Sequence, residues 1–216
     1  IGTGNVLAKV NYINGKISGA FTTYHKNSKP ELEGNIKDGD YHGLWKYYHS
    51  NGNLKSEGHY KNRWKKIGNW KYYHANGNLE SEGNCEDGNC VGYWKYYNYY
   101  GLLKAEGNLD GNYDGGYYRV GLWKTYHFKG KLESEGSYKD GKQIGLWKTY
   151  HYNDTLSSIG KYDGGSKHGL WKCYHDNGKL KSNGKYDYSY KVGDWVYYHD
   201  NGNKSDLGSY KGGTGG

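Results

Sequence analysis

The sequence predicts an all-β repeat protein, an elongated, twisted, single-layer antiparallel meander of about eight β-hairpins. Three observations predict this fold class. A Gly-x-aromatic signature recurs along the 216-residue chain, in most steps after 24 residues. Each copy places an Asn-Gly or similar turn signal between two β-compatible runs. Finally, 37 Gly and 28 Tyr against 2 Phe and no Met leave aromatic rings as the main material for a core.

The stretch 43–60 shows the repeating unit most clearly. It predicts a strand at Trp45–His49, a two-residue type I′ turn at Asn51-Gly52 and a returning strand at Leu54–Tyr60. The predicted facing pairs are Trp45 with Gly58, Lys46 with Glu57, Tyr47 with Ser56, Tyr48 with Lys55, and His49 with Leu54. An indole over a residue without a side chain, and an ammonium opposite a carboxylate, are favourable cross-strand pairs.

The same residue types return in each copy, with a glycine thirteen residues after each aromatic. We therefore expect a ladder of Trp and Gly along the middle of the sheet, in which Trp123 covers Gly136 and only glycine fits. The predicted structural ladder is Trp45, Trp70, Trp94, Trp123, Trp147, Trp171, Trp195, Gly58, Gly83, Gly107, Gly136, Gly160 and Gly184.

The copies predict a single β-repeat domain over residues 1–216. Its parts are a half repeat at 5–20, eight repeats over 21–212 and a Gly-rich tail at 212–216, with about seventeen strands in all. The irregularities are a longer loop at 109–119, an extra Trp64 in a turn, and Pro30 on a returning strand, where it suits an edge or a bulge. The chain begins at Ile1 without Met, which fits a processed chain, a fragment or an unseen start.

Charge and hydropathy narrow the classes of partner. The formal charge of +8 fits either a polyanion partner or a solvated lysine-rich face, and the interleaving of Lys with Glu and Asp favours the solvated face over specific nucleic-acid binding. No apolar run is long enough for a transmembrane helix. Strand alternation puts the Trp row on one face of the sheet. We expect that face to be covered by curling, by another sheet or by a partner.

The motif G-x-W-K-x-Y-x-x-N-G-x-L-x-x-x-G-x-Y resembles the MORN repeat, and most closely the bacterial variant found in YwqK-type antitoxin proteins. The resemblance covers residues from about 6 to 212. It implies a sheet of hairpins that serves as a scaffold or interaction module, and it carries no catalytic residues. Ser28 and Asp154 replace the turn glycine and depart from the pattern.

A weaker resemblance links Trp-Lys-Tyr-Tyr followed by Asn-Gly to the choline- and glucan-binding repeats of bacterial surface proteins. Those repeats are nearer 20 residues long, so the period argues against them. The aromatic rows would still suit stacking on sugars.

Two side-chain groups are candidate sites. Histidine recurs at one repeat position, and neighbouring copies two strands apart, roughly 9–10 Å, are too distant to share a metal ion. We expect each His to pack on its facing Leu, and we expect no metal and no cofactor. Cys85 and Cys90 face each other across a turn, so a disulfide and two free thiols both remain open. Cys173 has no evident partner.

No catalytic triad, phosphate loop or close carboxylate pair is visible, which predicts a protein that is not an enzyme. The first hypothesis is a structural protein that associates with itself, as an oligomer or filament, through open sheet edges and the aromatic face. The alternative is a binding module, either an antitoxin or immunity protein that grips a toxin, or a binder of surface glycans. An extracellular or cell-surface location is favoured over the cytoplasm.

Overall fold

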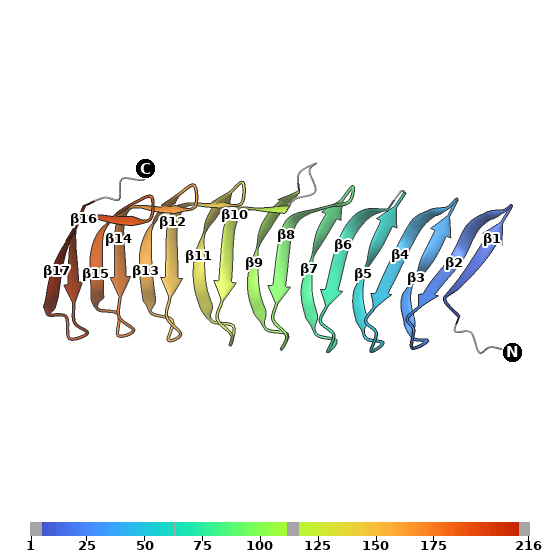
Figure 1. Ribbon diagram of the computed structural model, residues 1–216, viewed down its shortest axis with the longest axis horizontal. Helices are drawn as coiled ribbons and strands as arrows, with labels where there is room; N and C mark the ends of the chain where they lie inside the picture. The colour runs from blue at the N-terminus through green and yellow to red at the C-terminus, as the bar shows by residue number, and fades with distance from the viewer. Residues whose placement is uncertain (1–5, 63, 112–116, 212–216) are drawn as a thin grey trace. The chain divides into compact units, whose positions relative to one another are not determined.

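The computed structural model describes residues 6–62, 64–111 and 117–211, and its regular elements there are seventeen β-strands without a helix (Figure 1). The strands are β1 (Ala8–Ile13), β2 (Lys16–Tyr24), β3 (Pro30–Lys37), β4 (Asp40–Tyr48), β5 (Leu54–Lys61), β6 (Lys65–Tyr73), β7 (Leu79–Glu86), β8 (Asn89–Tyr97), β9 (Leu103–Gly111), β10 (Tyr117–Tyr126), β11 (Leu132–Lys139), β12 (Lys142–Tyr150), β13 (Leu156–Asp163), β14 (Ser166–Tyr174), β15 (Leu180–Asp187), β16 (Tyr190–Tyr198) and β17 (Lys204–Tyr210).

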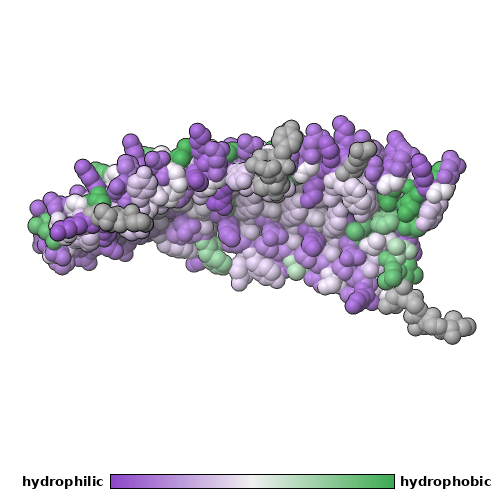
Figure 2. Space-filling model, turned by 45° about the horizontal axis from the view of Figure 1, so that its top comes forward, coloured by the Kyte–Doolittle hydropathy of each residue, from purple (hydrophilic) through white to green (hydrophobic). Residues whose placement is uncertain are grey.

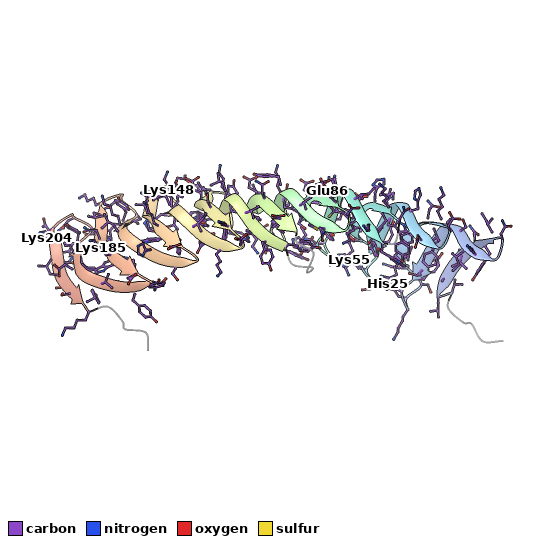
Figure 3. The ribbon with its side chains drawn as sticks, turned by 90° about the horizontal axis from the view of Figure 1, so that it is seen from above. His25, Lys55, Glu86, Lys148, Lys185 and Lys204 are labelled. Atoms are coloured by element: carbon purple, nitrogen blue, oxygen red, sulfur yellow. The ribbon has the colours of Figure 1, made fainter. Side chains whose placement is uncertain are left out.

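The chain divides into two compact units. Unit 1 comprises residues 1–103 and 109–117, and unit 2 comprises 104–108 and 118–216. In unit 1 each strand from β1 to β8 pairs antiparallel with the next. In unit 2 the same holds from β10 to β17. Each unit is a single layer with side chains on both faces (Figure 3). The predicted all-β meander of hairpins is confirmed, whereas a single domain over 1–216 stays a prediction.

Type I′ turns join one hairpin to the next. At Asp38-Gly39 the flanking residues pair across two residues with φ of 55° and 88°, the positive values that a type I′ turn requires. Asn, Asp and Gly fill the equivalent positions of most of these turns, because they adopt positive φ at little cost. Tyr188 and Ser189 take the same conformation without such a residue, with φ of 45° and 68°.

The hairpin tips differ from the prediction. In the unit at 43–60, Gly52 N donates to His49 O and His49 N donates to Asn53 O, which closes a loop of three residues. Only Gly52 has positive φ, so the tip is a type I turn followed by a glycine bulge rather than a type I′ turn. The bulge shifts the register by one residue, and Tyr48 pairs with Leu54. The predicted pairs of Tyr48 with Lys55 and of His49 with Leu54 are therefore wrong.

The middle of each hairpin carries Trp opposite Gly. Trp45 pairs with Gly58, Lys46 with Glu57 and Tyr47 with Ser56. The indole that lies on Gly58, however, belongs to Trp70 of the following strand. In the same way Trp147, and not Trp123 as predicted, covers Gly136. Any β-carbon at these glycines would overlap the indole, so each Trp fixes the approach of the strand before it.

The Trp face, which we define as the face that carries Trp45 and its equivalents, is covered by its own side chains. The seven ladder tryptophans are at most 4% exposed. Tyr60 and Tyr186 meet Trp70 and Trp195 edge-on at 5.0 Å between ring centroids. Lys or Arg side chains lie over several of the indoles, for example Arg119 at 4.3 Å from Trp123. The indoles are thus buried within the chain itself, and the expected cover by curling, by a second sheet or by a partner stays a prediction.

The irregular positions fall at turns and strand ends. Pro30 is the first residue of β3, where its missing N–H is tolerated. Trp64 lies in the turn before β6 with φ of 70°, half-exposed, and its ring is 3.7 Å from that of Tyr41. Of the predicted longer loop at 109–119, residues 112–116 lie outside the described part of the chain. On either side of these residues, β9 ends at Gly111 and β10 begins at Tyr117.

Candidate functional site

The buried Trp row leaves the opposite face of the sheet as the surface for contacts. We call this the Lys face and define it by Leu44, Lys46, Tyr48 and Glu57 with their equivalents in the other repeats. Strand alternation puts these residues on the side away from Trp45. The residue before each Trp is exposed in this row, as Leu44, Tyr93, Leu122, Leu146 and Leu170. The Lys face therefore combines apolar and charged side chains.

The histidine row joins neighbouring repeats at the tip end of the hairpins. His49 Nε2 donates to the backbone carbonyl of Tyr73 at 2.9 Å, and His151 Nε2 donates to that of Tyr174 at 2.9 Å. The same bond is made by His25, His74, His127 and His175. The expected packing of His on its facing Leu is wrong, because the bulge removes that pairing. Among the described residues no group of three His, Cys, Asp or Glu side chains could hold a metal ion.

The tip asparagines repeat this device. Asn51 Oδ1 accepts from Asn53 N within its own tip, while Asn51 Nδ2 donates to the carbonyl of Ala75 in the next one. Asn153 and Asn177 donate to Asp176 and Asp200 in the same way. Sequence reasoning assigned Asn only a backbone role. The recurrence of Asn and His every 24 residues was the signal that each also bridges repeats.

A second ladder runs across the Lys face. In five repeats the Tyr three residues after the Trp donates its hydroxyl to a Glu on the preceding strand, which we call a Tyr–Glu rung. Tyr73 bonds Glu57 at 2.8 Å and Tyr150 bonds Glu135 at 2.8 Å. Further rungs are Tyr48–Glu33, Tyr97–Glu82 and Tyr126–Glu106. Glu57, Glu82 and Glu135 each also pair in register with a Lys on both neighbouring strands, so an O–H donor and positive charge surround the carboxylate.

Three positions towards the end of unit 2 break this ladder. Ile159, Asn183 and Leu207 stand where the other repeats carry Glu. Within the described residues, the hydroxyl of Tyr174 has no hydrogen-bond partner, and the buried Oδ1 of Asn183 has none either. Lys172 pairs in register with Ile159 on one side and with Asn183 on the other, so no carboxylate faces it from either strand.

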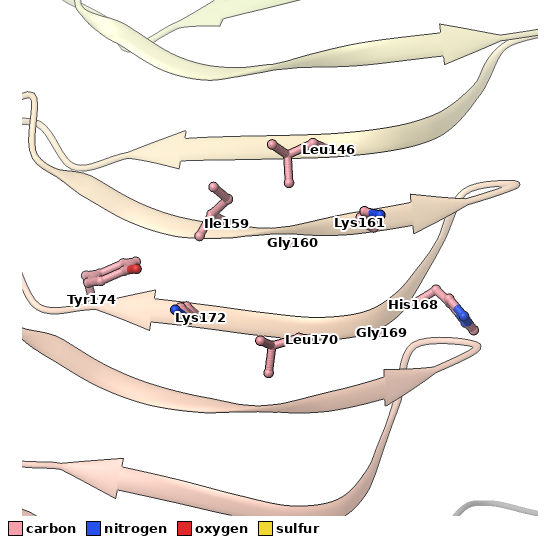
Figure 4. Close-up of a pocket in the computed structure, with 9 residues that line it drawn as sticks. All are labelled: Leu146, Ile159, Gly160, Lys161, His168, Gly169, Leu170, Lys172 and Tyr174. Carbon is pink, nitrogen blue, oxygen red and sulfur yellow. The ribbon is translucent and has the colours of Figure 1, made fainter.

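A hollow of about 530 Å³ opens at the first break (Figure 4). Leu146, Ile159 and Leu170 contribute its apolar wall from three consecutive strands, β12, β13 and β14. Leu146 and Leu170 are each 51% exposed, so this wall faces solvent. The other side chains around it are Lys161, His168, Lys172 and Tyr174. We call this the Ile159 hollow; all of it belongs to unit 2.

Positive charge surrounds the Ile159 hollow. On the Lys face of β12 to β16, strand alternation and register place five lysines, Lys148, Lys161, Lys172, Lys181 and Lys185, and three acidic residues, Asp163, Asp187 and Asp194. Lys148 lies 3.8 Å from Glu135, and His168 lies 3.5 Å from Asp187. Figure 2 shows hydrophilic side chains over most of the visible surface. The surplus of lysine makes this region attractive to anions.

Cys85 and Cys90 form a separate group in unit 1. They are cross-strand partners at a type I′ turn, both buried, with free thiols 3.2 Å apart between the two Sγ atoms. The Cys85 thiol donates to Cys90, and with help from Tyr117 and Lys66 this lowers the pKa of Cys90 to about 7. The same hydrogen bond, together with burial, raises the pKa of Cys85. The disulfide between them stays a prediction.

No helix in the described part of the chain is long and apolar enough to cross a bilayer.

Comparison with known proteins agrees with the repeat pattern. Four segments match the family model described as a MORN repeat variant, at residues 41–62, 66–85, 119–140 and 167–188. No curated protein matches the sequence. Two solved structures are similar over 88% of this chain, which spans 13% of each of theirs. One is a crystal structure of TcdB2-TccC3, with 12% identity and a TM-score of 0.24, and the other is of TcdB2-TccC3-Cdc42, with 12% identity and a TM-score of 0.21. The four family matches support a MORN-repeat protein, a repeat-based module of the binding and scaffold type.

Proposed function

We propose that this chain is a non-catalytic binding module that holds a protein partner on the Lys face of unit 2. The Ile159 hollow is the observation that carries the proposal, because it joins an exposed apolar wall to lysines without facing carboxylates. The MORN-type repeats support it, since that family is generally non-catalytic. The backbone polar groups are used in strand pairing and the His row in bridging repeats, which leaves the Lys face as the variable surface.

The test is site-specific photocrosslinking in the native cell. A benzophenone amino acid at Leu170 should give a discrete protein adduct, and one at Leu44, the equivalent position in unit 1, should not. Adding Ile159→Glu, which fills the hollow with the residue type of the other repeats, should remove the adduct. Equal adducts at both positions, or an adduct that survives Ile159→Glu, would contradict the proposal.

A second candidate function is self-association, and one observation favours it. Around β1, Leu7, Tyr12 and Ile13 are more than half exposed, and Figure 2 shows apolar side chains gathered at the β1 end of unit 1. Apolar side chains on an edge strand favour pairing with another chain. Sedimentation velocity should then show concentration-dependent oligomers that Ile13→Lys disperses, and a monomer at all concentrations would exclude this candidate.

Two more specific binding functions are an antitoxin and a glycan binder. An antitoxin of the YwqK type would use the Ile159 hollow for its toxin. A glycan binder would need exposed rings, and the buried Trp row does not supply them. Exposed rings do occur at Tyr99 and Tyr100. Sugar titration of Trp123→Ala and Tyr100→Ala separates the two sets of rings, and a loss in Tyr100→Ala alone would favour the glycan form.

A further inference from the structure

We propose that the Ile159 hollow takes an acidic, aliphatic segment of a partner protein, whose carboxylate occupies the place that Glu holds in the other repeats. This inference rests on the proposed function and names the chemistry of the partner. The complete rungs of the same chain show which groups surround a carboxylate at this position of the repeat.

A complete rung has three groups around the carboxylate. Glu135 pairs in register with Lys124 on one side and with Lys148 on the other, and it accepts a hydrogen bond from the hydroxyl of Tyr150. Glu57 has the same surroundings in unit 1, between Lys46 and Lys71 and bonded by Tyr73. Two lysines in register and one tyrosine hydroxyl therefore surround the carboxylate position, and at Glu135 the ammonium of Lys148 lies 3.8 Å away.

At Ile159 all three groups remain and only the carboxylate is missing. Lys148 and Lys172 face Ile159 from the two neighbouring strands, and Tyr174 stands where Tyr150 stands in the rung before. Among the described residues the Tyr174 hydroxyl has no hydrogen-bond partner. An incoming carboxylate would gain the hydroxyl donor and Lys172, which no carboxylate faces in register, and would share Lys148 with Glu135 as Glu82 shares Lys71 with Glu57.

The apolar wall determines what must accompany the carboxylate. Leu146 and Leu170 flank the Ile159 side chain and are half-exposed. Covering them removes apolar area from water, which a bare inorganic anion does not do. The ligand therefore carries an aliphatic group beside its acid, as a Leu-Glu or Ile-Asp sequence does.

The spacing of the Leu row favours a peptide over a small carboxylic acid. In unit 2 the row continues as Leu122, Leu146 and Leu170, one on every second strand. Strands about 4.8 Å apart place these side chains roughly 9.6 Å apart. A polyproline II segment returns to the same face every three residues, or about 9.3 Å. A segment with an aliphatic residue at every third position matches this row and lies across the strands.

The experiment uses the full chain and three synthetic probes, Ac-LPELPELPE-NH2, its LPK counterpart and its LPQ counterpart, each with a fluorescent label. Fluorescence anisotropy should show that the LPE probe binds at least tenfold more tightly than the LPQ probe, while the LPK probe does not bind. Raising the salt concentration should weaken the binding of LPE, because the lysines are exposed. Equal binding of LPE and LPK would overturn the proposal.

Two matched variants test the position. Ile159→Glu supplies the carboxylate within the chain and should weaken LPE binding at least tenfold, without loss of fold, because five other repeats carry Glu there. Glu135→Ile should create a second hollow between Leu122 and Leu146 and raise the stoichiometry. An unchanged affinity in Ile159→Glu would overturn the inference. If LPQ binds as tightly as LPE and Ile159→Glu still abolishes the Leu170 crosslink, the binding module stands and the acidic partner is wrong.

Discussion

Glu135 and Ile159 occupy the same place in neighbouring repeats of unit 2, and their surroundings differ far less than their chemistry. Each faces a Lys on both sides, and each lies beside the Tyr that follows a buried Trp. The register on the Trp face is the same in both repeats, with Trp123 opposite Gly136 and Trp147 opposite Gly160. The Trp face is thus the face whose packing is the same in both repeats, whereas the residues on the Lys face differ in chemistry.

The largest expected effect tests the claim that the Trp face is equally demanding in both repeats. Gly136→Val and Gly160→Val should each destabilise the protein by about 3 kcal/mol or more, because the new side chain would overlap Trp147 or Trp171. Urea denaturation followed by Trp fluorescence measures both variants. Ile159→Val on the opposite face is the control and should cost about 1 kcal/mol or less.

A glycine variant that unfolds at the same urea concentration as the parent would contradict this account of the Trp face. If only one of the two variants is as stable as the parent, the two repeats differ in packing on the Trp face. The surroundings of Glu135 and Ile159 could then no longer be treated as equivalent.

The middle of each hairpin could be predicted from sequence because its chemistry is pairwise. Trp45 opposite Gly58 and Lys46 opposite Glu57 follow from the two-residue alternation of strands once a turn is located. The tip could not be read in the same way. Asn-Gly fits both a type I′ turn and a type I turn with a glycine bulge, and these differ by one residue in loop length. The bonds from Asn51 and His49 to the next repeat accompany the longer loop.

The candidate site was harder to predict than the fold. The Trp row dominated the sequence and suggested an aromatic face that needs a cover, because strand alternation alone does not show that Tyr60 and Lys66 lie over Trp70. The Ile159 hollow left only a faint trace in the sequence, an Ile at the position where five other copies carry Glu. Its meaning depends on Tyr174, whose link to that position appears only when strands are placed side by side.

The second prediction concerns an exception within the Trp face of unit 1. Cys85 takes the place of Tyr60, opposite Cys90. Oxidation by a low-molecular-weight disulfide should join the two sulfurs and release two thiols. The disulfide should raise the free energy of unfolding by about 2 kcal/mol, because it closes only a short loop in the unfolded chain. Thermal melts with and without reductant measure this, with Cys85→Ser as the control. Alkylation of Cys90 should accelerate as the pH rises through about 7, the lowered pKa.

An oxidised protein whose Tm does not change with reductant would show that the two sulfurs do not bond. An alkylation rate that rises only near the ordinary thiol pKa would show that the Cys85 hydrogen bond does not activate Cys90.

The third prediction concerns the pKa of the tyrosine in a complete rung, Tyr150 bonded to Glu135. Burial, and then the hydrogen bond to Glu135, raises the pKa of Tyr150 to about 12. The neutral phenol is thus favoured by folding, so its contribution to stability is complete below pH 10 and is lost as the pH rises from 10 to 12. Glu135→Gln should lower the pKa of Tyr150, because it removes the carboxylate that the phenol donates to.

Ultraviolet difference titration of tyrosinate measures this shift, with Tyr150→Phe to assign the signal. A Tyr150 signal that is unmoved by Glu135→Gln would mean that burial alone sets its pKa. The comparison between Glu135 and Ile159 would then lose its electrostatic part.

The smallest expected effect lies at the tips, where the repeats should be equivalent. Ser28 and Asp154 hold φ of 64° and 68° at the position that Gly52 occupies with φ of 93°. Ser28→Gly should stabilise by about 1 kcal/mol at most, because relief of the left-handed conformation is partly offset by the entropy of Gly in the unfolded chain. Asp154→Gly should gain less, since Asp154 pairs with Lys131 at 2.7 Å. Gly52→Ser, measured in the same urea series, should cost what Ser28→Gly gains. If both substitutions destabilise, each tip is adapted to its own residue, and the repeats differ at their tips as well as on the Lys face.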